Sequence, residues 1–351
     1  MRAWQKQRFR WDANVGRLIF KRLIGAIPNV VGVVIVTFVL TRALPGDPAA
    51  YFAGPAASQE AVEQIRVQLG LDKSLAHQFV LYLRDLAHGD LGTSLTTGQP
   101  VLQELGARLP ASLELTLLGL LLAVAVAIPL GIFAATRPGS WLDHSCRLFA
   151  TAGVSLPTFF TGLLLAYVFY FLLGIAPSPL GRIDVIYSPP PAFTGFYLID
   201  SLLAGDLELF WAAFKQLLLP AITLALFVMA PLMRMTRASM LGVLSSDFIR
   251  TARAGGLSRT TVLIRYAFRN ALLPVVTTLG MVFSFLLGSN VLVEKVFAWP
   301  GIGSYVIEAL VASDYAPVQG FVLTMALLYV LLNLTIDILY GFIDPRVGVD
   351  E

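Results

Sequence analysis

Six long apolar stretches divide the chain, and polar segments of unequal length separate them. A helix needs about 20 mostly apolar residues to cross roughly 30 Å of hydrocarbon. By this criterion the pattern predicts membrane spans at residues 23–41, 113–135, 148–173, 216–233, 272–293 and 320–343. Several spans contain proline, which a bundle tolerates because neighbouring helices satisfy the freed backbone groups: Pro28, Pro129, Pro157 and Pro220. We therefore expect an all-α polytopic membrane protein with six transmembrane helices and a core at 113–343.

The polar segment between the first two spans, residues 42–112, is longer than a simple turn. Ser58 and Ser74 stand before runs with apolar residues at helical spacing, and serine is a favoured N-cap residue. Gly70 and Gly89 mark the ends of these runs. The pattern predicts two short amphipathic helices that lie on the bundle or on the membrane surface. Two interpretations stand side by side: a packed connector, or a docking ledge for something delivered from outside.

The loop between the fourth and fifth spans, residues 234–271, combines arginines with a double glycine. Three of its residues can cap a helix, and one of them would place an acid in the first turn, which favours the helix dipole: Ser245, Ser246 and Asp247. The predicted helix covers about 248–254, and Gly255 and Gly256 end it. A second helix, capped by Thr260 or Thr261, leads into the fifth span.

Helical spacing places Phe248, Ala252 and Gly255 on one face of the first of these helices, while Arg250 and Arg253 lie along another. Small residues permit close approach to a partner, and guanidinium groups form fork-like contacts with carboxylates. Two simpler interpretations compete with a partner contact. The arginines either only enforce the topology or lie on anionic lipid, which is worth about 1 kcal/mol each.

The composition supports a membrane location and limits the chemistry. Hydrophobic residues make up 57% of the 351 residues and charged residues 13%, with a mean hydropathy of +0.75. Soluble domains carry about 25% charged residues. A single cysteine, Cys146, excludes a disulfide within the chain. Neither an HExxH motif nor a GxxxxGK[ST] phosphate loop is present, so any ATP that drives this protein must bind to another chain.

The distribution of charge predicts the orientation, because lysine and arginine accumulate on the cytoplasmic side. Residues 1–22 contain seven basic residues against one acid, and the 234–271 loop contains seven against one. The two loops that would lie on the other side of the membrane are acidic. Residues 43–112 contain four basic and seven acidic residues, and residues 174–208 contain one basic and four acidic residues. We expect both termini in the cytoplasm, although the short tail at 344–351 is mildly acidic.

Several motifs resemble the permease subunits of ATP-binding cassette importers, and more narrowly the dipeptide and oligopeptide permease group. The loop carries TARAGGLS and RYAFRNALLP, and the segment after the first span carries LGLDKSLAHQF and GDLGTSLTTGQPVLQELGARLPASLELT. Further matches are DSLLAGD, LLLPAITLAL, RMTRASML, EKVFAWPGIG and the final DPR. The resemblance covers nearly the whole chain, and the motifs occur in the family's order.

The resemblance implies a type I importer permease (MetI-like) fold in the bacterial inner membrane, with an extracytoplasmic helical segment and cytoplasmic coupling helices. It implies a second, related permease subunit, two ATPase subunits that bind ATP and magnesium, and an extracytoplasmic substrate-binding protein. This chain itself would bind no cofactor and no metal and would catalyse no reaction, and nucleic acid is not an expected partner. The residues implied to contact the ATPase are Asp247, Phe248, Ile249, Arg250, Thr251, Ala252, Arg253, Ala254, Gly255, Gly256 and Leu257.

The sequence departs from the family pattern in places. Arg250-Thr251-Ala252 stands where the loop signature has Glu-Ala-Ala, which implies a different charge at the partner contact. Gly242 stands where an acid is expected, and Ser74 replaces a proline. The segment 174–215 aligns only loosely with the family.

Polar residues inside the spans are candidates for the translocation pathway. Intramembrane acids are costly and face protein or a water-filled cavity. Serine and asparagine either line such a pathway or join helices by hydrogen bonds. The candidates are Glu114, Ser284, Ser289, Asn290 and Asp337.

The expected function is that of half of a pathway for peptides delivered by the external protein. The same architecture with another cargo is an alternative, such as a nickel complex, glutathione, haem or a sugar. A secondary transporter that works alone is a further alternative, and it predicts several intramembrane charges and inverted repeats.

Overall fold

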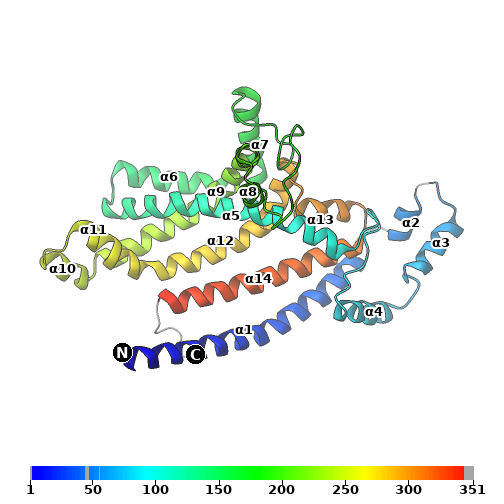
Figure 1. Ribbon diagram of the computed structural model, residues 1–351, viewed down its shortest axis with the longest axis horizontal. Coiled ribbons are helices and arrows are strands. Elements are labelled where there is room, and N and C mark those ends of the chain that lie inside the picture. The colour runs from blue at the N-terminus through cyan, green and yellow to red at the C-terminus, as the bar shows by residue number, and fades with distance from the viewer. Residues whose placement is uncertain (1, 44–46, 55, 344–351) are drawn as a thin grey trace.

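The computed structural model describes residues 2–43, 47–54 and 56–343 as an elongated bundle of helices (Figure 1). In the described part of the chain the backbone forms no sheet, and only an isolated bridge joins Thr93 to Pro100. The predicted tail at 344–351 lies outside the described residues, and so do the side chains of residues 2–18. The protein therefore has the all-α architecture that the hydrophobic pattern predicts.

The helices follow one another along the chain in a simple order. They are α1 (Arg2–Ala43), α2 (Pro48–Ala53), α3 (Gln59–Gln68), α4 (Leu75–Ala87), α5 (Val101–Thr136), α6 (Trp141–Ser155), α7 (Thr158–Leu165), η1 (Ala166–Leu172), α8 (Tyr197–Leu203), α9 (Leu207–Leu244), α10 (Asp247–Ala254), α11 (Arg259–Thr261), η2 (Val262–Phe268), α12 (Arg269–Val296), α13 (Ile302–Val311) and α14 (Tyr315–Ile343).

Five stretches of helix in the described residues are long and apolar enough to cross a membrane: Ile19–Ala43, Val101–Thr136, Leu207–Leu244, Arg259–Val296 and Tyr315–Gly341. The third predicted span, 148–173, is not one helix but falls on α6 and on the shorter apolar helix Thr158–Leu172. The break has a local cause, because a residue before proline avoids the helical conformation. Leu156 before Pro157 is extended, with φ −104° and ψ 136°.

The fifth span also differs from its predicted form. Helix α11, the wider turns of η2 and α12 follow without interruption, so the helical run begins at Arg259 instead of 272. Its cap is Ser258, whose hydroxyl accepts from the Thr261 amide at 3.3 Å, and not Thr260 or Thr261. The second loop helix is therefore continuous with the membrane span, which transmits a displacement better than a flexible linker, and residues 255–258 separate it from α10.

The core lies where α5, α9 and α12 meet. Small residues allow α5 and α9 to approach closely, which is how helices associate in membranes. A Cβ atom at Gly131 would lie 2.7 Å from the Cβ of Thr236, and one at Gly119 would lie 3.0 Å from the Cβ of Leu224. Helices α1 and α14 pair along one side of this core (Figure 1).

The segment between the first two spans has the two predicted helices and their caps. The Ser58 hydroxyl accepts from the Ala61 amide at 3.2 Å, and the Ser74 hydroxyl accepts from the His77 amide at 3.4 Å. Serine at position 74, where the family pattern has proline, therefore begins α4. An additional short helix, α2, precedes them and was not predicted.

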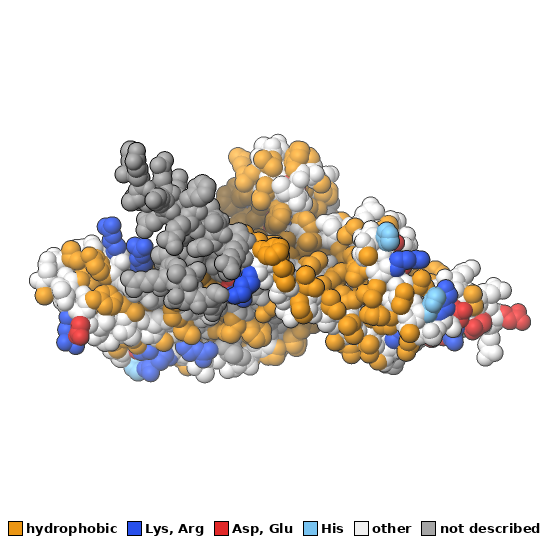
Figure 2. Space-filling model, turned by 90° about the horizontal axis from the view of Figure 1, so that it is seen from below, with side chains coloured by type: hydrophobic (Ala, Val, Ile, Leu, Met, Phe, Trp, Pro, Cys, Tyr) orange, Lys and Arg blue, Asp and Glu red, His pale blue; other side chains and the backbone are white. Residues whose placement is uncertain are grey.

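The two ends of the bundle differ in charge. Helix α10, the start of α1 and the end of α14 lie at one end, and α2, α3 and α4 lie at the other (Figure 1). Figure 2 shows hydrophobic side chains over the middle of the face that is seen from below, with basic side chains toward both ends. Acidic side chains gather at the far end (Figure 2).

Candidate coupling and translocation site

Helix α10 forms the tip of one end of the bundle and rests on it through apolar side chains (Figure 1). Ile249 and Ala252 are buried and belong to one cluster with Ile132 of α5 and Met240 of α9. Positions three apart lie on the same face of a helix, so this face points to the bundle. Of the three predicted caps, Ser246 occupies the N-cap position, although its hydroxyl bonds to a preceding carbonyl.

The other face of α10 carries exposed side chains. Phe248, Arg250 and Arg253 are exposed, and a guanidinium nitrogen of Arg250 lies 3.4 Å from a carboxylate oxygen of Asp247. These two side chains are 76% and 91% exposed, and such surface pairs contribute little stability. The predicted partner face therefore needs correction, because Ala252 packs on the bundle while Phe248 and the arginines face away from it.

Two glycines end α10 with a defined geometry. The Leu257 amide donates to the Ala252 carbonyl at 3.3 Å, and the Gly256 amide donates to the Arg253 carbonyl at 3.0 Å. This is the Schellman pattern, which needs a left-handed residue just after the helix. Gly256 supplies it with a φ of +76°, whereas Gly255 keeps a φ of −72° that any residue can adopt.

A cleft of about 500 Å³ lies between α12 and α14. Of the five predicted pathway residues, Ser284 and Asp337 are brought together here. The remaining lining residues are Thr277, Gly280, Met281, Phe285, Tyr329, Asn333, Ile336 and Tyr340. The cleft thus combines hydroxyl, amide and carboxylate groups with aromatic surface, as small-ligand sites do.

Asp337 is not isolated in this cleft. The Arg22 guanidinium of α1 approaches its carboxylate at 2.8 Å, and the two side chains are 53% and 15% exposed. Nearby, the Tyr340 hydroxyl donates to the Thr277 hydroxyl at 2.8 Å across the α12–α14 contact. The carboxylate therefore holds α1 against α14 in addition to facing the cleft.

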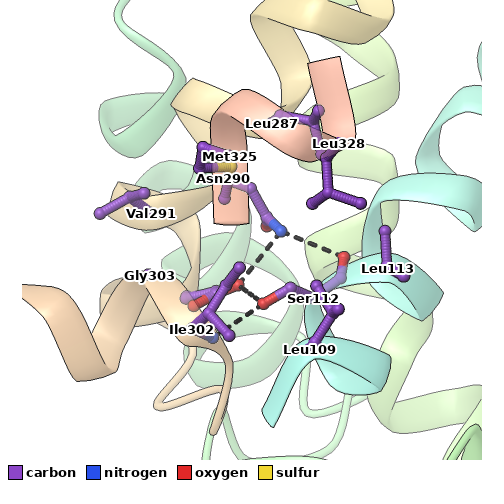
Figure 3. A pocket seen from close by; sticks show the side chains of 11 residues that line it. Leu109, Ser112, Leu113, Leu287, Asn290, Val291, Ile302, Gly303, Met325 and Leu328 are labelled. Carbon is purple, nitrogen blue, oxygen red and sulfur yellow. Dashed lines mark hydrogen bonds between the residues drawn. The ribbon is translucent and has the colours of Figure 1, made fainter. Parts of the chain in front are cut away.

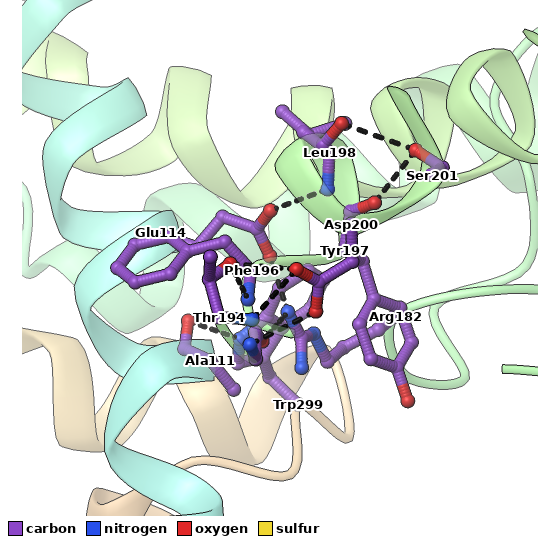
Figure 4. Close-up of polar contacts among 11 residues, drawn as sticks. Ala111, Glu114, Arg182, Thr194, Phe196, Tyr197, Leu198, Asp200, Ser201 and Trp299 are labelled. Atoms are coloured by element: carbon purple, nitrogen blue, oxygen red, sulfur yellow. Dashed lines mark hydrogen bonds and ion pairs between the residues drawn. The ribbon is translucent and has the colours of Figure 1, made fainter. Parts of the chain in front are cut away.

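The other three predicted pathway residues lie elsewhere. Ser289 is partly buried, and its hydroxyl approaches the Leu286 carbonyl of its own helix at 3.5 Å. Glu114 is buried and forms an ion pair with Arg182 at 2.5 Å, while its second oxygen accepts from the Leu198 amide at 2.8 Å (Figure 4). Its carboxylate thus anchors the connection between η1 and α9, so the structure gives Glu114 a structural partner.

Asn290 belongs to a buried polar cluster around Glu294 (Figure 3). The Asn290 amide donates at 3.1 Å to the Glu294 carboxylate, and the Ser112 hydroxyl donates to the same oxygen at 2.5 Å. The other oxygen accepts from the Ser304 amide at 2.9 Å. Glu294 is 1% exposed, and this cluster joins α12, α5 and α13.

Glu294 was not among the predicted site residues, although the sequence carries a signal for it. It begins the run EKVFAWPGIG at the end of an apolar span. A Cβ atom at Gly301 would lie 2.2 Å from a Glu294 oxygen, and one at Gly303 would lie 2.6 Å from the Cα of Val291. The two glycines thus make room for the carboxylate and for close helix approach.

A further ion pair lies between α6 and α9, near the end of the bundle that carries α10. The Arg237 guanidinium makes two contacts to the buried Asp143 carboxylate, one of them at 2.8 Å. The hydrogen bond from Arg237 is the largest cause that lowers the pKa of Asp143 to about 2, and burial opposes it. The Gly139 amide adds a further hydrogen bond at 2.9 Å. This contact fixes the start of α6 to α9.

The described residues contain no group of three or more His, Cys, Asp or Glu side chains that could hold a metal ion. What they do contain is a protruding helix tip with exposed arginines, a polar cleft between two long helices and several buried carboxylates with hydrogen-bond partners. This arrangement suits the transmission of movement across a membrane bundle.

Comparison with known proteins identifies matching families and relatives. The family model described as "Binding-protein-dependent transport system inner membrane component" matches residues 127–349. A second model, described as "Binding-prot-dependent transport system membrane comp, N-term", matches residues 15–116. Together they cover most of α1 and the rest of the chain through α14, except residues 117–126 within α5.

Individual relatives match over almost their entire length. The chain is 47% identical to the probable D,D-dipeptide transport system permease protein DdpB of Escherichia coli K12, over 94% of this chain and 97% of the relative. It is 41% identical to the dipeptide transport system permease protein DppB of the same strain, over 94% and 98%. The DppB protein of Alkalihalophilus pseudofirmus is 40% identical over 93% and 98%.

Proposed function

Because the chain belongs to the family of binding-protein-dependent transport system inner membrane components, we propose that it forms half of a translocation pathway for di- or oligopeptides. It is a multi-pass membrane permease and a transport subunit, not an enzyme. Short peptides are the favoured cargo because the matched relatives are named as dipeptide permeases. The alternative with another cargo in the same architecture has no specific observation in its favour.

The observation that supports coupling best is the two-sided character of α10. One face is fixed to the bundle through Ile249 and Ala252, and the other presents Phe248, Arg250 and Arg253 to a partner. In this proposal an ATPase subunit contacts residues 247–257 and pushes the helix when two such subunits close on ATP. The movement of α10 is then transmitted through α11 and η2 to α12.

The remaining components follow from the same proposal. A second permease subunit completes the pathway, and an extracytoplasmic binding protein delivers the peptide to the end that carries α2, α3 and α4. Two ATPase subunits bind ATP and magnesium, so this chain needs no cofactor of its own. Both termini lie on the cytoplasmic side of the bacterial inner membrane with α10, which the basic residues of the 234–271 loop support.

The coupling role is tested in the complete transporter, reconstituted with its ATPases and binding protein. We expect Arg250→Glu combined with Arg253→Glu to abolish peptide-stimulated ATP hydrolysis or co-purification of the ATPase. In this proposal the two arginines contact carboxylates of the ATPase, and the reversed charges would repel those carboxylates. The melting temperature should not change, since both side chains are exposed. Arg259→Glu, which reverses an exposed charge just beyond the helix, is the matched control. Normal coupled hydrolysis in the double variant would refute the assignment.

A glycine variant tests the same contact without a change in charge. Gly256→Val places a side chain on left-handed backbone at the end of α10, which costs roughly 1–2 kcal/mol. Gly255→Val changes the neighbouring position, where φ is −72°. We expect less peptide-stimulated ATP hydrolysis in Gly256→Val than in Gly255→Val. Equal activity would show that the left-handed turn is not needed for coupling.

A further inference from the structure

The cleft between α12 and α14 offers walls for an apolar side chain. Met281, Phe285 and Tyr329 line it, and each is more than half exposed. Its volume of about 500 Å³ lies within the roughly 300–1,000 Å³ that is usual for sites of small ligands. The helices come into contact at Gly280, where a Cβ atom would lie 2.1 Å from the Cδ1 of Ile336. The helices α12 and α14 therefore pack closely against each other beside the cleft.

An ion pair lies at the cleft: Asp337 lines it, and Arg22 of α1, which is not among the lining residues, approaches the carboxylate from outside. Arg22 and Asp337 lie 2.8 Å apart, and the arginine is half exposed. Arg22 belongs to α1, which packs mainly on α14 and is otherwise largely exposed. The arginine side chain therefore has room to move away from the carboxylate, while Asp337 stays fixed within α14.

This pairing favours a ligand that carries both charges. A ligand with a single positive or negative charge would pair with one member and leave the other without that contact, and the cost is larger for Asp337, which is 15% exposed, than for Arg22, which is 53% exposed. A zwitterion replaces both halves of the ion pair at once. A short peptide with free ends is such a ligand, since its amino end is cationic and its carboxyl end is anionic.

Neutral groups in the cleft complete the match. The Asn333 carboxamide makes no hydrogen bond to another described residue, and it lies in the cleft with the Ser284 hydroxyl. A carboxamide both donates and accepts, as the peptide group between two residues requires. The Phe285 and Tyr329 rings supply apolar surface for the side chains.

We propose that this cleft is a subsite for a short zwitterionic peptide, which opens the Arg22–Asp337 ion pair and takes its place. The ammonium end pairs with Asp337, the carboxylate end with Arg22, and the peptide group with Asn333. The inference rests on the proposed peptide transport and adds where this chain holds the peptide and by which groups.

The test is photolabelling of the complete transporter in lipid nanodiscs with a dipeptide that carries a diazirine side chain. Adducts are located by mass spectrometry, and peptide uptake is measured in liposomes made from the same preparation. We expect adducts on Met281, Phe285 or Tyr329. An unmodified dipeptide should suppress them, and the same dipeptide acetylated at its amino end and amidated at its carboxyl end should not.

Variants separate a ligand contact from a structural one. Asp337→Asn and Arg22→Gln should each reduce the adducts about tenfold, the factor for one charge-assisted hydrogen bond. Thr335→Ala on the same helix is the control, because Thr335 does not line the cleft. Ser284→Phe leaves the ion pair in place and fills the cleft, so it should also remove the adducts while the complex still assembles. This variant keeps the test valid if Asp337→Asn fails to assemble.

The outcomes distinguish this subsite from the transport function itself. Peptide uptake without adducts in the cleft overturns the subsite alone. Suppression by the blocked dipeptide, or unchanged adducts in Asp337→Asn, overturns the zwitterion contact. A phospholipid that fills the cleft would leave the adducts absent at every dipeptide concentration, and this too overturns the proposal. Absence of peptide uptake by the unaltered transporter overturns the proposed peptide function, and the subsite with it.

Discussion

Two regions of the bundle hold their polar side chains in opposite ways. Near α8 and α13, the buried carboxylates of Glu114 and Glu294 each accept several hydrogen bonds from different elements. Near α10, the Asp247–Arg250 pair is largely exposed, and the Asp337–Arg22 pair includes a half-exposed arginine. The first region is tied together. In the second, these two pairs offer charges to other molecules, while Asp143 and Arg237 form the buried contact between α6 and α9.

A short stretch of α5 explains why the α13 end is tied so firmly. The Ala111 carbonyl accepts from the Trp299 indole at 2.9 Å, the Ser112 hydroxyl bonds Glu294, and Glu114 bonds Arg182. Two segments distant in sequence, around residue 182 and at residues 294–299, therefore meet on one turn of α5. An end built in this way moves as a unit, and this suits a bundle that rocks when it is pushed at the α10 end.

The largest expected effect comes from the buried ion pair. Arg182→Met leaves the Glu114 carboxylate buried without its cation, and such a loss costs about 3–5 kcal/mol. We expect a large drop in the melting temperature of the purified complex. Arg66→Met, which removes the partly exposed partner of Asp47, is the control and should change the melting temperature little. Similar drops in both variants would remove the distinction between buried and exposed pairs.

The second effect concerns the Glu294 cluster. Glu294→Ala leaves the Ser112 hydroxyl and the Ser304 amide without their acceptor, at a cost of about 1–3 kcal/mol for a buried group. Glu308→Ala removes an exposed carboxylate that pairs with Lys295 and serves as the matched control. Thermal unfolding of both variants measures the difference. A stable Glu294→Ala protein would mean that the α13 end is not held by this cluster.

A smaller effect is expected where α12 meets α14 beside the cleft. Gly280→Ala forces the end of the Ile336 side chain to shift, which costs on the order of 1 kcal/mol because that end can rotate. Gly288→Ala on the same helix adds a methyl group where nothing lies within 4 Å, so it should be neutral or slightly stabilising. The melting temperatures of the two variants should therefore move in different directions. Equal shifts would show that α12 and α14 do not pack closely at Gly280.

The last effect depends on pH and concerns Asp143. Its pKa in the folded protein is about 2, below the ordinary value of 3.8 for an aspartate, so the ionised carboxylate stabilises the fold at pH values above 3.8. This contribution is lost as the pH falls toward 2. We expect the melting temperature to fall more between about pH 5 and pH 3 for the unaltered protein than for Asp143→Asn. Parallel curves would contradict a paired carboxylate.

Local patterns in the sequence predicted the helices and the loop signature well. Five of the six predicted spans lie on helices of membrane-spanning length, whereas the third, 148–173, is divided between α6 and a shorter apolar helix. Ser58 and Ser74 cap the helices that they precede. The double glycine predicted the end of α10, because a left-handed turn at Gly256 is a property of the backbone there. These features depend on neighbours along the chain, and so one sequence suffices to find them.

Only the tertiary structure decided the partners of the buried polar groups. Glu114 meets Arg182 across 68 positions of sequence, and Glu294 meets Ser112 across 182. It also turned Ala252 toward the bundle and brought Ser284 and Asp337 to one cleft. The sequence determined that these residues are polar and lie in or near membrane spans. Which groups satisfy them depends on how the helices pack, because a buried charge takes whatever donor the fold brings within reach.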